Sequence, residues 1–190
     1  MTHPLFSRAR LFAAAILVLP LATEAKEAML VLDRSQSHIE IAVKATVDSF
    51  VARVEDFDVA VAVDPESGRV GYTTFHANLT AVKTGGTERD YDMGVWLQMS
   101  EFPQDSFELA ALDRGPDGVF LARGRLKLHG QQHDVNFPVR ITADRGLITI
   151  DGAALLDTRQ YGLPIIRMLW VLTVDPVVRV HFRLQGRLAR

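Results

Sequence analysis

The stretch FLARGRLKLHGQQHDVNFPVRIT, residues 120–142, contains two runs in which apolar and polar side chains alternate. Successive side chains of a β-strand point to opposite faces, so this period of two predicts two half-buried strands joined by a hairpin through LHGQQH at 128–133. A strand with one apolar and one charged face is typical of an antiparallel sheet. The residues on the apolar faces are Phe120, Ala122, Gly124, Leu126, Leu128, Val135, Phe137, Val139 and Ile141.

The same alternation continues on both sides of this hairpin. It predicts further strands at 38–47, 50–63, 69–82, 106–113, 146–156 and 177–186. Turn sequences rich in Asp, Gly and Pro separate several of them, at 64–68, 115–118 and 144–146. About eight strands in meander order fit either a closed up-and-down barrel or a two-sheet sandwich. The last strand is long and regular, with no proline or bulge to protect an exposed edge, and this favours the closed barrel.

The composition is that of a globular domain. The 190 residues are 48% hydrophobic and 23% charged, and this length is enough for one domain with a sizeable core. The formal net charge of −2 gives no electrostatic reason to expect a nucleic-acid partner. The chain has no cysteine, which excludes disulfides, thiolate nucleophiles and cysteine metal sites.

Residues 1–25 have the pattern of a secretory signal peptide. Arg8 and Arg10 precede an apolar run at 11–22, and small residues then lead to a cleavage site after Ala25. The apolar run is shorter than the roughly 20 residues that span a bilayer. We expect an exported protein that begins at Lys26; the alternative is an uncleaved N-terminal anchor.

The segment TGGTERDYDMGVWLQMSEFP, residues 84–103, interrupts the strand pattern. Apolar side chains recur there at helical spacing, in one stripe with Tyr91 and Val95 and another with Met93 and Trp96. Thr87 is the expected N-cap, and the helix is expected to end before the proline at 103. The segment predicts a short helix that lies across one end of the barrel.

Three acids, Glu88, Asp90 and Asp92, gather at the start of this helix. Paired carboxylates can act in acid–base catalysis, so a hydrolase is one hypothesis. Acids at a helix start also interact favourably with the helix dipole and the free N–H groups, and we prefer this structural interpretation. Arg89, the one cation in the segment, is expected to pair with an acid.

Two further features concern the interior of the barrel. Small residues such as Ala77, Ala122 and Gly124 fall at inward positions and predict either a narrow apolar tunnel or a filled core in which they match bulky neighbours. LPIIRMLWVL, residues 163–172, is too apolar for an exposed loop and carries only Arg167. It is expected either to pack on the barrel or to form an apolar mouth containing one cation.

Short motifs in a fixed order give the chain a family resemblance. They are Thr84-Gly85, Arg89-Asp90, Phe102-Pro103 and Phe107; then Leu126, Gly130 and Val135; then Tyr161-Gly162; and, near the start, Asp33, Ser37, Ile39 and Ile41. In this order and spacing they resemble the YceI-like family, the polyisoprenoid-binding proteins of bacteria. The resemblance covers residues 30–188.

The resemblance implies a lipocalin-like antiparallel barrel around an extended hydrophobic channel, in a protein exported to the periplasm. The implied ligand is a long isoprenoid lipid, such as a polyprenyl phosphate or a quinone tail, and no cofactor is implied beyond it. The expected partners are this lipid, a membrane or membrane protein in transient contact, and a second copy in a homodimer.

The candidate site residues follow from these expectations. Arg167 and Arg89 are the candidates for the ligand head group, because a buried anion needs a cation or N–H donors. The candidates for the channel wall are Phe75, Ala77, Met93, Trp96, Phe120, Ala122, Gly124, Phe137, Tyr161 and Trp170. No metal site is expected, because His129 and His133 are separated by a hairpin and the other histidines lie on separate strands.

Three functions remain open at this point: a carrier of an apolar ligand, a filled barrel that serves as a structural or dimerisation module, and a hydrolase. We favour the carrier, and therefore a protein that is not an enzyme.

Overall fold

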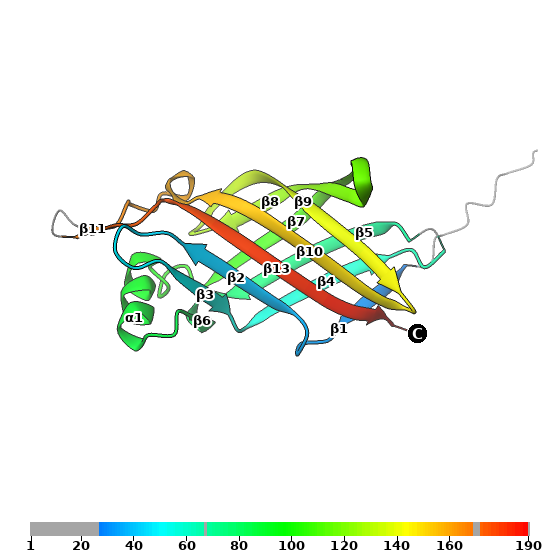
Figure 1. The fold of residues 1–190 in the computed structure, drawn as a ribbon, viewed down its shortest axis with the longest axis horizontal. Helices are drawn as coiled ribbons and strands as arrows, with labels where there is room; N and C mark the ends of the chain where they lie inside the picture. Colours follow the sequence, from blue (N-terminus) through cyan, green and yellow to red (C-terminus); the bar gives the residue numbers. More distant parts are fainter. Residues whose placement is uncertain (1–26, 67, 169–171, 190) are drawn as a thin grey trace, which may run out of the picture.

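The computed structural model describes residues 27–66, 68–168 and 172–189, and it shows a closed, all-antiparallel β-barrel (Figure 1). Strands pair in the order β1-β4-β5-β7-β8-β9-β10-β13, and pairing of β1 with β13 closes the ring, which confirms the predicted eight-stranded barrel. The strands of the ring are β1 (Ala28–Leu32), β4 (Phe57–Val63), β5 (Val70–Asn78), β7 (Gln104–Arg114), β8 (Val119–Leu128), β9 (Gln131–Asp144), β10 (Leu147–Asp157) and β13 (Val177–Leu188).

At three positions in the ring, the strand is divided into two separate pieces. The additional pieces are β2 (His38–Val43), β3 (Phe50–Val54) and β6 (Val82–Lys83). β2 continues the position of β1 beside β13, β3 pairs with β2, and β6 pairs with β3. The predicted strands at 50–63 and 69–82 are therefore each divided, the predicted strand at 38–47 ends at Val43, and β1 was not predicted.

The breaks have a local cause that the alternation does not reveal. The side chain of Asn78 accepts a hydrogen bond from the N–H of Thr80 and caps a 3₁₀ turn, η1 (Leu79–Ala81), which stops β5. Beside it, the N–H of Glu55 donates to the carbonyl of Ala81, and the N–H of Asn78 donates to the carbonyl of Asp56. The two neighbouring strands are thus interrupted together.

Tight turns join the longest strands. His129 and Gly130, between β8 and β9, have φ of 50° and 72°, and Arg145 and Gly146, between β9 and β10, have φ of 47° and 77°. Positive φ at both central residues is the conformation that matches the twist of a two-residue hairpin. The hairpins predicted at 128–133 and 144–146 are confirmed. A 3₁₀ turn, η2 (Pro116–Gly118), joins β7 to β8.

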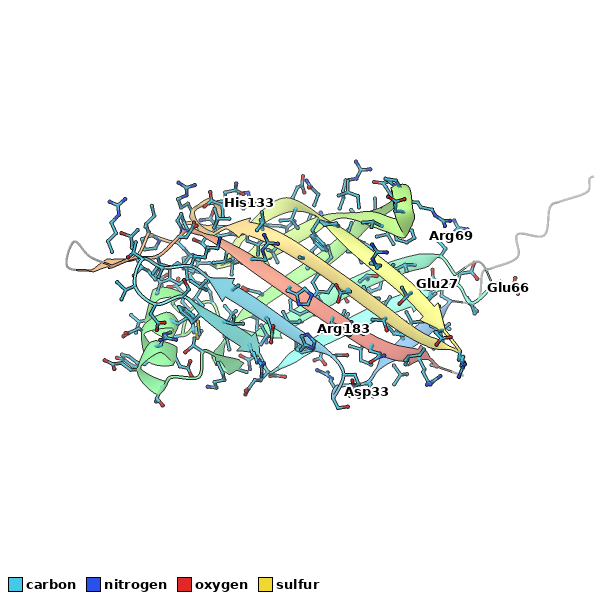
Figure 2. All side chains as sticks on the ribbon, in the orientation of Figure 1. Glu27, Asp33, Glu66, Arg69, His133 and Arg183 are labelled. Carbon is cyan, nitrogen blue, oxygen red and sulfur yellow. The ribbon has the colours of Figure 1, made fainter. Side chains whose placement is uncertain are left out.

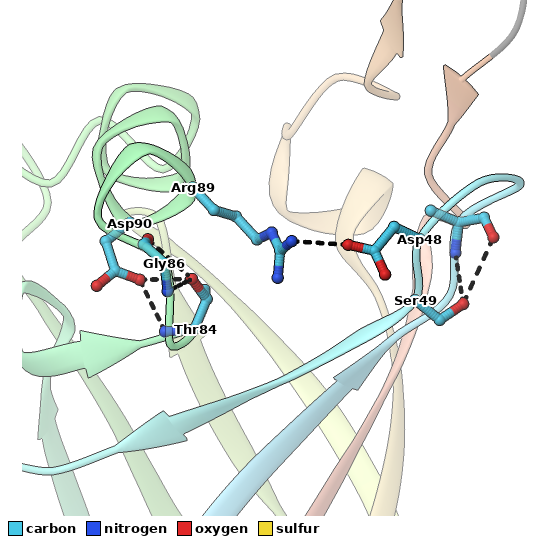
Figure 3. Close-up of polar contacts among 7 residues, drawn as sticks. Asp48, Ser49, Thr84, Gly86, Arg89 and Asp90 are labelled. Atoms are coloured by element: carbon cyan, nitrogen blue, oxygen red, sulfur yellow. Dashed lines mark hydrogen bonds and ion pairs between the residues drawn. The ribbon is translucent and has the colours of Figure 1, made fainter.

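Helix α1 (Thr87–Trp96) lies at one end of the barrel, between β6 and β7 in the chain (Figure 1). Its N-cap is Gly86 and not Thr87, and Gly86 has no side chain to cap the helix. The carboxylate of Asp90 instead accepts hydrogen bonds from the N–H and the hydroxyl of Thr84, at 2.7 and 2.6 Å, which fixes the turn before the helix and holds the pKa of Asp90 below its usual value (Figure 3).

The two predicted stripes of α1 have different surroundings. Met93 packs against the core of the barrel, whereas Tyr91 and Val95 are 72% and 61% exposed. In the described residues, no helix is both long and apolar enough to cross a membrane. The outer faces of the strands carry charged side chains such as Arg183 on β13, beside exposed apolar ones such as Leu155 on β10 (Figure 2).

The end of the barrel that carries α1 also carries the segment from β10 to β13 (Figure 1). This segment begins with a 3₁₀ turn, η3 (Thr158–Tyr161), and continues into a short hairpin of β11 (Arg167–Met168) and β12 (Leu172–Thr173). Asp157 caps η3 by accepting from the N–H of Arg159, and Gly162, with φ of 75°, ends it. Residues 1–25 and Trp170 lie outside the described residues.

Candidate ligand-binding cavity

The lumen of the barrel contains a cavity of about 160 Å³ whose wall is apolar except for Thr73. Three of the predicted channel residues, Phe75, Ala122 and Phe137, line it. The inward residues of the surrounding strands otherwise pack together as the core. The barrel is thus largely filled, but it keeps an apolar space in its centre.

A second and larger space of about 900 Å³ lies at the end of the barrel beside α1; we call it the mouth chamber. Its wall combines Met93 and Trp96 of α1 with Phe50 of β3, the segment 164–166 and the start of β13. Two of the predicted channel residues, Met93 and Trp96, therefore lie here and not in the lumen.

The lumen cavity and the mouth chamber follow each other along the same strands. On β13, Val178 lines the chamber and Val180 lines the lumen cavity. On β10 and its extension, Leu156 lines the lumen cavity and Thr158 lines the chamber. Residues two positions apart on a strand share a face and are about 7 Å apart. The lumen cavity and the mouth chamber therefore follow one another toward this end of the barrel.

Contacts at both ends of α1 hold it at the mouth chamber. Arg89 donates to the carboxylate of Asp48 in the β2–β3 loop at 2.8 Å, and its guanidinium lies 4.5 Å from the ring centre of Phe50 (Figure 3). At the other end of the helix, the indole N–H of Trp96 donates to the carbonyl of Pro164 at 2.8 Å. Arg89 forms the expected ion pair, but with an acid 41 residues away in the sequence.

The charged side chains that line the mouth chamber are mostly acidic. They are the carboxylates of Asp48, Glu88, Asp92 and Asp175 and the single guanidinium of Arg89. Four negative charges and one positive charge leave this wall at −3. Among the described residues of this wall, Arg89 is the only cation and is already paired, so they offer no free cation to an anionic ligand.

The acids at the start of α1 do not converge on a common point. Glu88 and Asp92 lie on the chamber wall, while Asp90 is bonded to Thr84 and is not part of that wall. No described histidine lies on the chamber wall with them. In the described ranges, no three His, Cys, Asp or Glu side chains are close enough to hold a metal ion.

Several predicted site residues lie away from both spaces. Ala77 is buried in the core and Phe120 is half-buried, but neither lines the lumen cavity or the chamber. Gly124 faces inward, and the ring of Phe107 covers the place where a side chain would lie. Arg167 is exposed on β11 and is not part of the chamber wall. Whether it contacts a head group stays a prediction.

A buried polar cluster near the same end was missed by the sequence analysis. Asp105, at the start of β7, is only 9% exposed, and burial raises its pKa to about 7, although the backbone N–H of His129 donates to it. Tyr161 of η3 is 1% exposed, and burial and the nearby charge of Asp105 raise its pKa. Among the described residues, neither the Tyr161 hydroxyl nor Oδ1 of Asp105 has a hydrogen-bond partner.

Two histidines attach this cluster to the surrounding loops. The ring of His129 lies between the carbonyl of Tyr161, 3.0 Å from Nδ1, and the side chain of Gln98, 2.9 Å from Nε2. The ring of His133 meets that of Tyr161 edge to face, with centres 5.0 Å apart. The alternation of apolar and polar residues could have identified Asp105 as an inward residue. Asp105 is two residues before Phe107 and therefore lies on the same, inward face of the strand.

Comparison with known proteins agrees with this fold. A sequence profile of the YceI-like domain family matches residues 30–186. The solved structure of BcnA from Burkholderia cenocepacia has a TM-score of 0.73, with 16% identity over 82% of this chain and 99% of its own. No curated protein is significantly similar in sequence.

Two further solved structures share the fold. The YCEI protein of Campylobacter jejuni has a TM-score of 0.66, with 11% identity over 76% of this chain and 88% of its own. A polyisoprenoid binding domain from Saccharophagus degradans, implicated in plant cell wall breakdown, has a TM-score of 0.62, with 16% identity over 86% and 99%. The family profile covers most of the sequence, and the fold agrees with it. The chain therefore belongs to the YceI-like domain family.

Proposed function

We propose that the protein binds a lipid with an isoprenoid-type tail and serves as its carrier, without catalysing a reaction. The observation that carries this proposal is the apolar lumen cavity with the mouth chamber beyond it along β10 and β13. A concave, mostly apolar site with a few polar groups is the usual form of a small-molecule site. The similarity to a polyisoprenoid binding domain supports the choice of tail.

Export to the periplasm is part of the same proposal. It rests on the signal-peptide pattern of residues 1–25, with Arg8 and Arg10 before an apolar run and a small residue at the cleavage site. A carrier outside the cytoplasm has to shield a water-insoluble tail between membranes, and a closed barrel with an apolar interior meets that need.

The charge of the mouth chamber favours an uncharged head group, such as that of a quinone or an alcohol, over a phosphate. Two unit charges about 8 Å apart in water interact by roughly 0.5 kcal/mol, so three uncompensated carboxylates would weaken binding of an anion about tenfold at low salt. Added salt screens such charges and would reduce the difference. Arg167 is exposed and lies outside the described chamber wall, and its contact with the head group would reverse this preference.

Calorimetric titration of the delipidated protein with farnesol and with farnesyl phosphate tests this proposal. We expect farnesol to bind with a negative heat-capacity change, and farnesyl phosphate to bind about tenfold more weakly at low salt, with a smaller difference at high salt. Arg167→Ala should leave both affinities unchanged. If farnesyl phosphate binds more tightly than farnesol, and Arg167→Ala removes this difference, the assigned uncharged head group is wrong. Arg167 then lies at the head-group site.

A filled structural or dimerisation module is the second candidate, and the small lumen cavity favours it. A cavity of this volume holds about one ring of six carbon atoms, since an engineered cavity of about 150 Å³ in another protein binds benzene. A long tail would then have to lie mainly in the mouth chamber. If neither farnesol nor farnesyl phosphate binds, the module becomes the better interpretation.

A further inference from the structure

We propose that two phenylalanine–glycine pairs, Phe182 with Gly152 and Phe107 with Gly124, keep the lumen cavity open and set the size of the apolar group it admits. The group has about six carbon atoms, the size of a small ring or of one isoprene unit. This inference rests on the proposed function only for the identity of the ligand, because the geometry of the cavity is independent of it.

The first pair joins neighbouring strands. Phe182 on β13 lies directly opposite Gly152 on β10 in the sheet register. A Cβ atom placed on Gly152 would lie 2.9 and 3.1 Å from the two Cε atoms of the Phe182 ring, and closer still to Cζ. The tip of the ring therefore occupies the space that the side chain of any other residue would take.

The second pair is diagonal in the sheet register, because Gly124 lies directly opposite Leu109, two residues from Phe107. A Cβ atom on Gly124 of β8 would lie 2.5 Å from Cε2 and Cζ of Phe107 on β7. It would also collide with the backbone carbonyl of Glu108, so a substitution here would move a strand as well as a ring. Gly152 is the better position for a test, because the three atoms nearest to an added Cβ all belong to the Phe182 ring and none to the backbone.

Both rings line the lumen cavity, and Phe137 lies between them. Its ring centre is 5.5 Å from that of Phe107 and 5.7 Å from that of Phe182. A ring pushed off its glycine therefore meets Phe137 on one side and has the cavity as its free space. The cavity, at about 160 Å³, holds about one phenyl ring, so a ring that shifts into it leaves too little space for a bound ring.

The three rings thus determine how far a ligand can enter. With both rings against their glycines, the lumen has room for the terminal isoprene unit of a tail, and the rest of the ligand lies in the mouth chamber. Cross-strand packing of an aromatic ring over glycine also covers backbone that glycine leaves bare, which stabilises the sheet. The pairs therefore serve the fold and the cavity together.

Benzene binding to the whole protein, followed by NMR titration, tests the inference without an isoprenoid. We expect the unaltered protein to bind benzene, and Gly152→Ala to lower the affinity at least tenfold while the protein remains folded. The double variant Gly152→Ala with Phe182→Leu should recover binding, because leucine leaves room for the new methyl group. Unchanged benzene binding in folded Gly152→Ala, or no benzene binding by the unaltered protein, would overturn the inference.

Phe182→Leu alone provides a second test should Gly152→Ala fail to fold. Loss of the ring should enlarge the cavity, so that butylbenzene gains at least fivefold in affinity relative to benzene. An unchanged preference between the two would contradict the assigned role of Phe182. Farnesol titrated in parallel separates the two proposals. A protein that binds benzene but does not bind farnesol refutes the isoprenoid ligand. Farnesol binding that is the same in Gly152→Ala refutes the role of the pair.

Discussion

Asp105→Asn is expected to raise the free energy of unfolding at pH 8 by about 4 kcal/mol at most, the value of about three pKa units at 1.36 kcal/mol each. Asp105 is 9% exposed, and burial raises its pKa from 3.8 to about 7. At pH 8 the folded protein therefore holds a buried carboxylate whose Oδ1 has no partner among the described residues. Asparagine has no charge, and it keeps an oxygen that can accept from the N–H of His129.

The sign of the pH dependence follows from the raised pKa. The unfolded chain releases the proton of Asp105 near pH 3.8, whereas the folded protein holds it until about pH 7. The stability that this group contributes is therefore present below about pH 4, falls as the pH rises to about 7, and is constant above that.

Urea unfolding at pH 4.5 and pH 8 measures the effect. The difference between Asp105→Asn and the unaltered protein should be small at pH 4.5 and large at pH 8. Asp33→Asn, a change at an exposed acid in a turn, provides the control and should show no such gain at pH 8. The quantity to compare is the stability that Asp105→Asn gains over the unaltered protein at each pH. A gain at pH 8 no larger than the gain at pH 4.5 would contradict a buried carboxyl with a raised pKa.

Tyr161→Ala is expected to lower the free energy of unfolding by about 3–5 kcal/mol, as for other large buried aromatic side chains. Tyr161 is 1% exposed, and it anchors η3 to the barrel through contact with His133. Because the segment after η3 forms part of the chamber wall, the same variant should also weaken ligand binding.

Tyr161→Phe is the matched variant. Its loss of stability should be close to zero, because the hydroxyl is buried and has no hydrogen-bond partner in the described part of the chain. Removing a buried polar group that has no partner is neutral or stabilising. Thermal unfolding of both variants at pH 7 checks the pair of expectations, and a large loss in Tyr161→Phe would show that the hydroxyl has a partner in solution.

Most of the fold could be predicted from the sequence, because the period of two reports directly which face of a strand is buried. The hairpin at 128–133 and the closure through the last strand follow from it. The interruptions near Glu55 and Leu79 could not be predicted, because apolar side chains alternate through them and the break depends on the cap made by Asn78. The predicted N-cap of α1, Thr87, was wrong. The N-cap is Gly86, and the carboxylate of Asp90 bonds to Thr84 in the turn before the helix.

The candidate site was predicted less well. Sequence spacing identifies inward positions, but it cannot show whether a ring lies over a glycine or projects into the lumen. Phe182 and Gly152, on separate strands 30 residues apart, illustrate this: their register decides the size of the cavity. The pairing of Arg89 with Asp48 is likewise set by how two loops meet at the end of the barrel. The sequence also left open whether the barrel was filled.

The mouth chamber and the lumen cavity are proposed to hold an isoprenoid lipid. The most direct test is solvent extraction of the protein, purified in mild conditions from the cells that naturally make it, followed by mass spectrometry of the extract. We predict an isoprenoid lipid with an uncharged head group, close to one molecule per barrel and absent from an equally purified control protein. A barrel that yields no isoprenoid lipid above the control level would contradict the account.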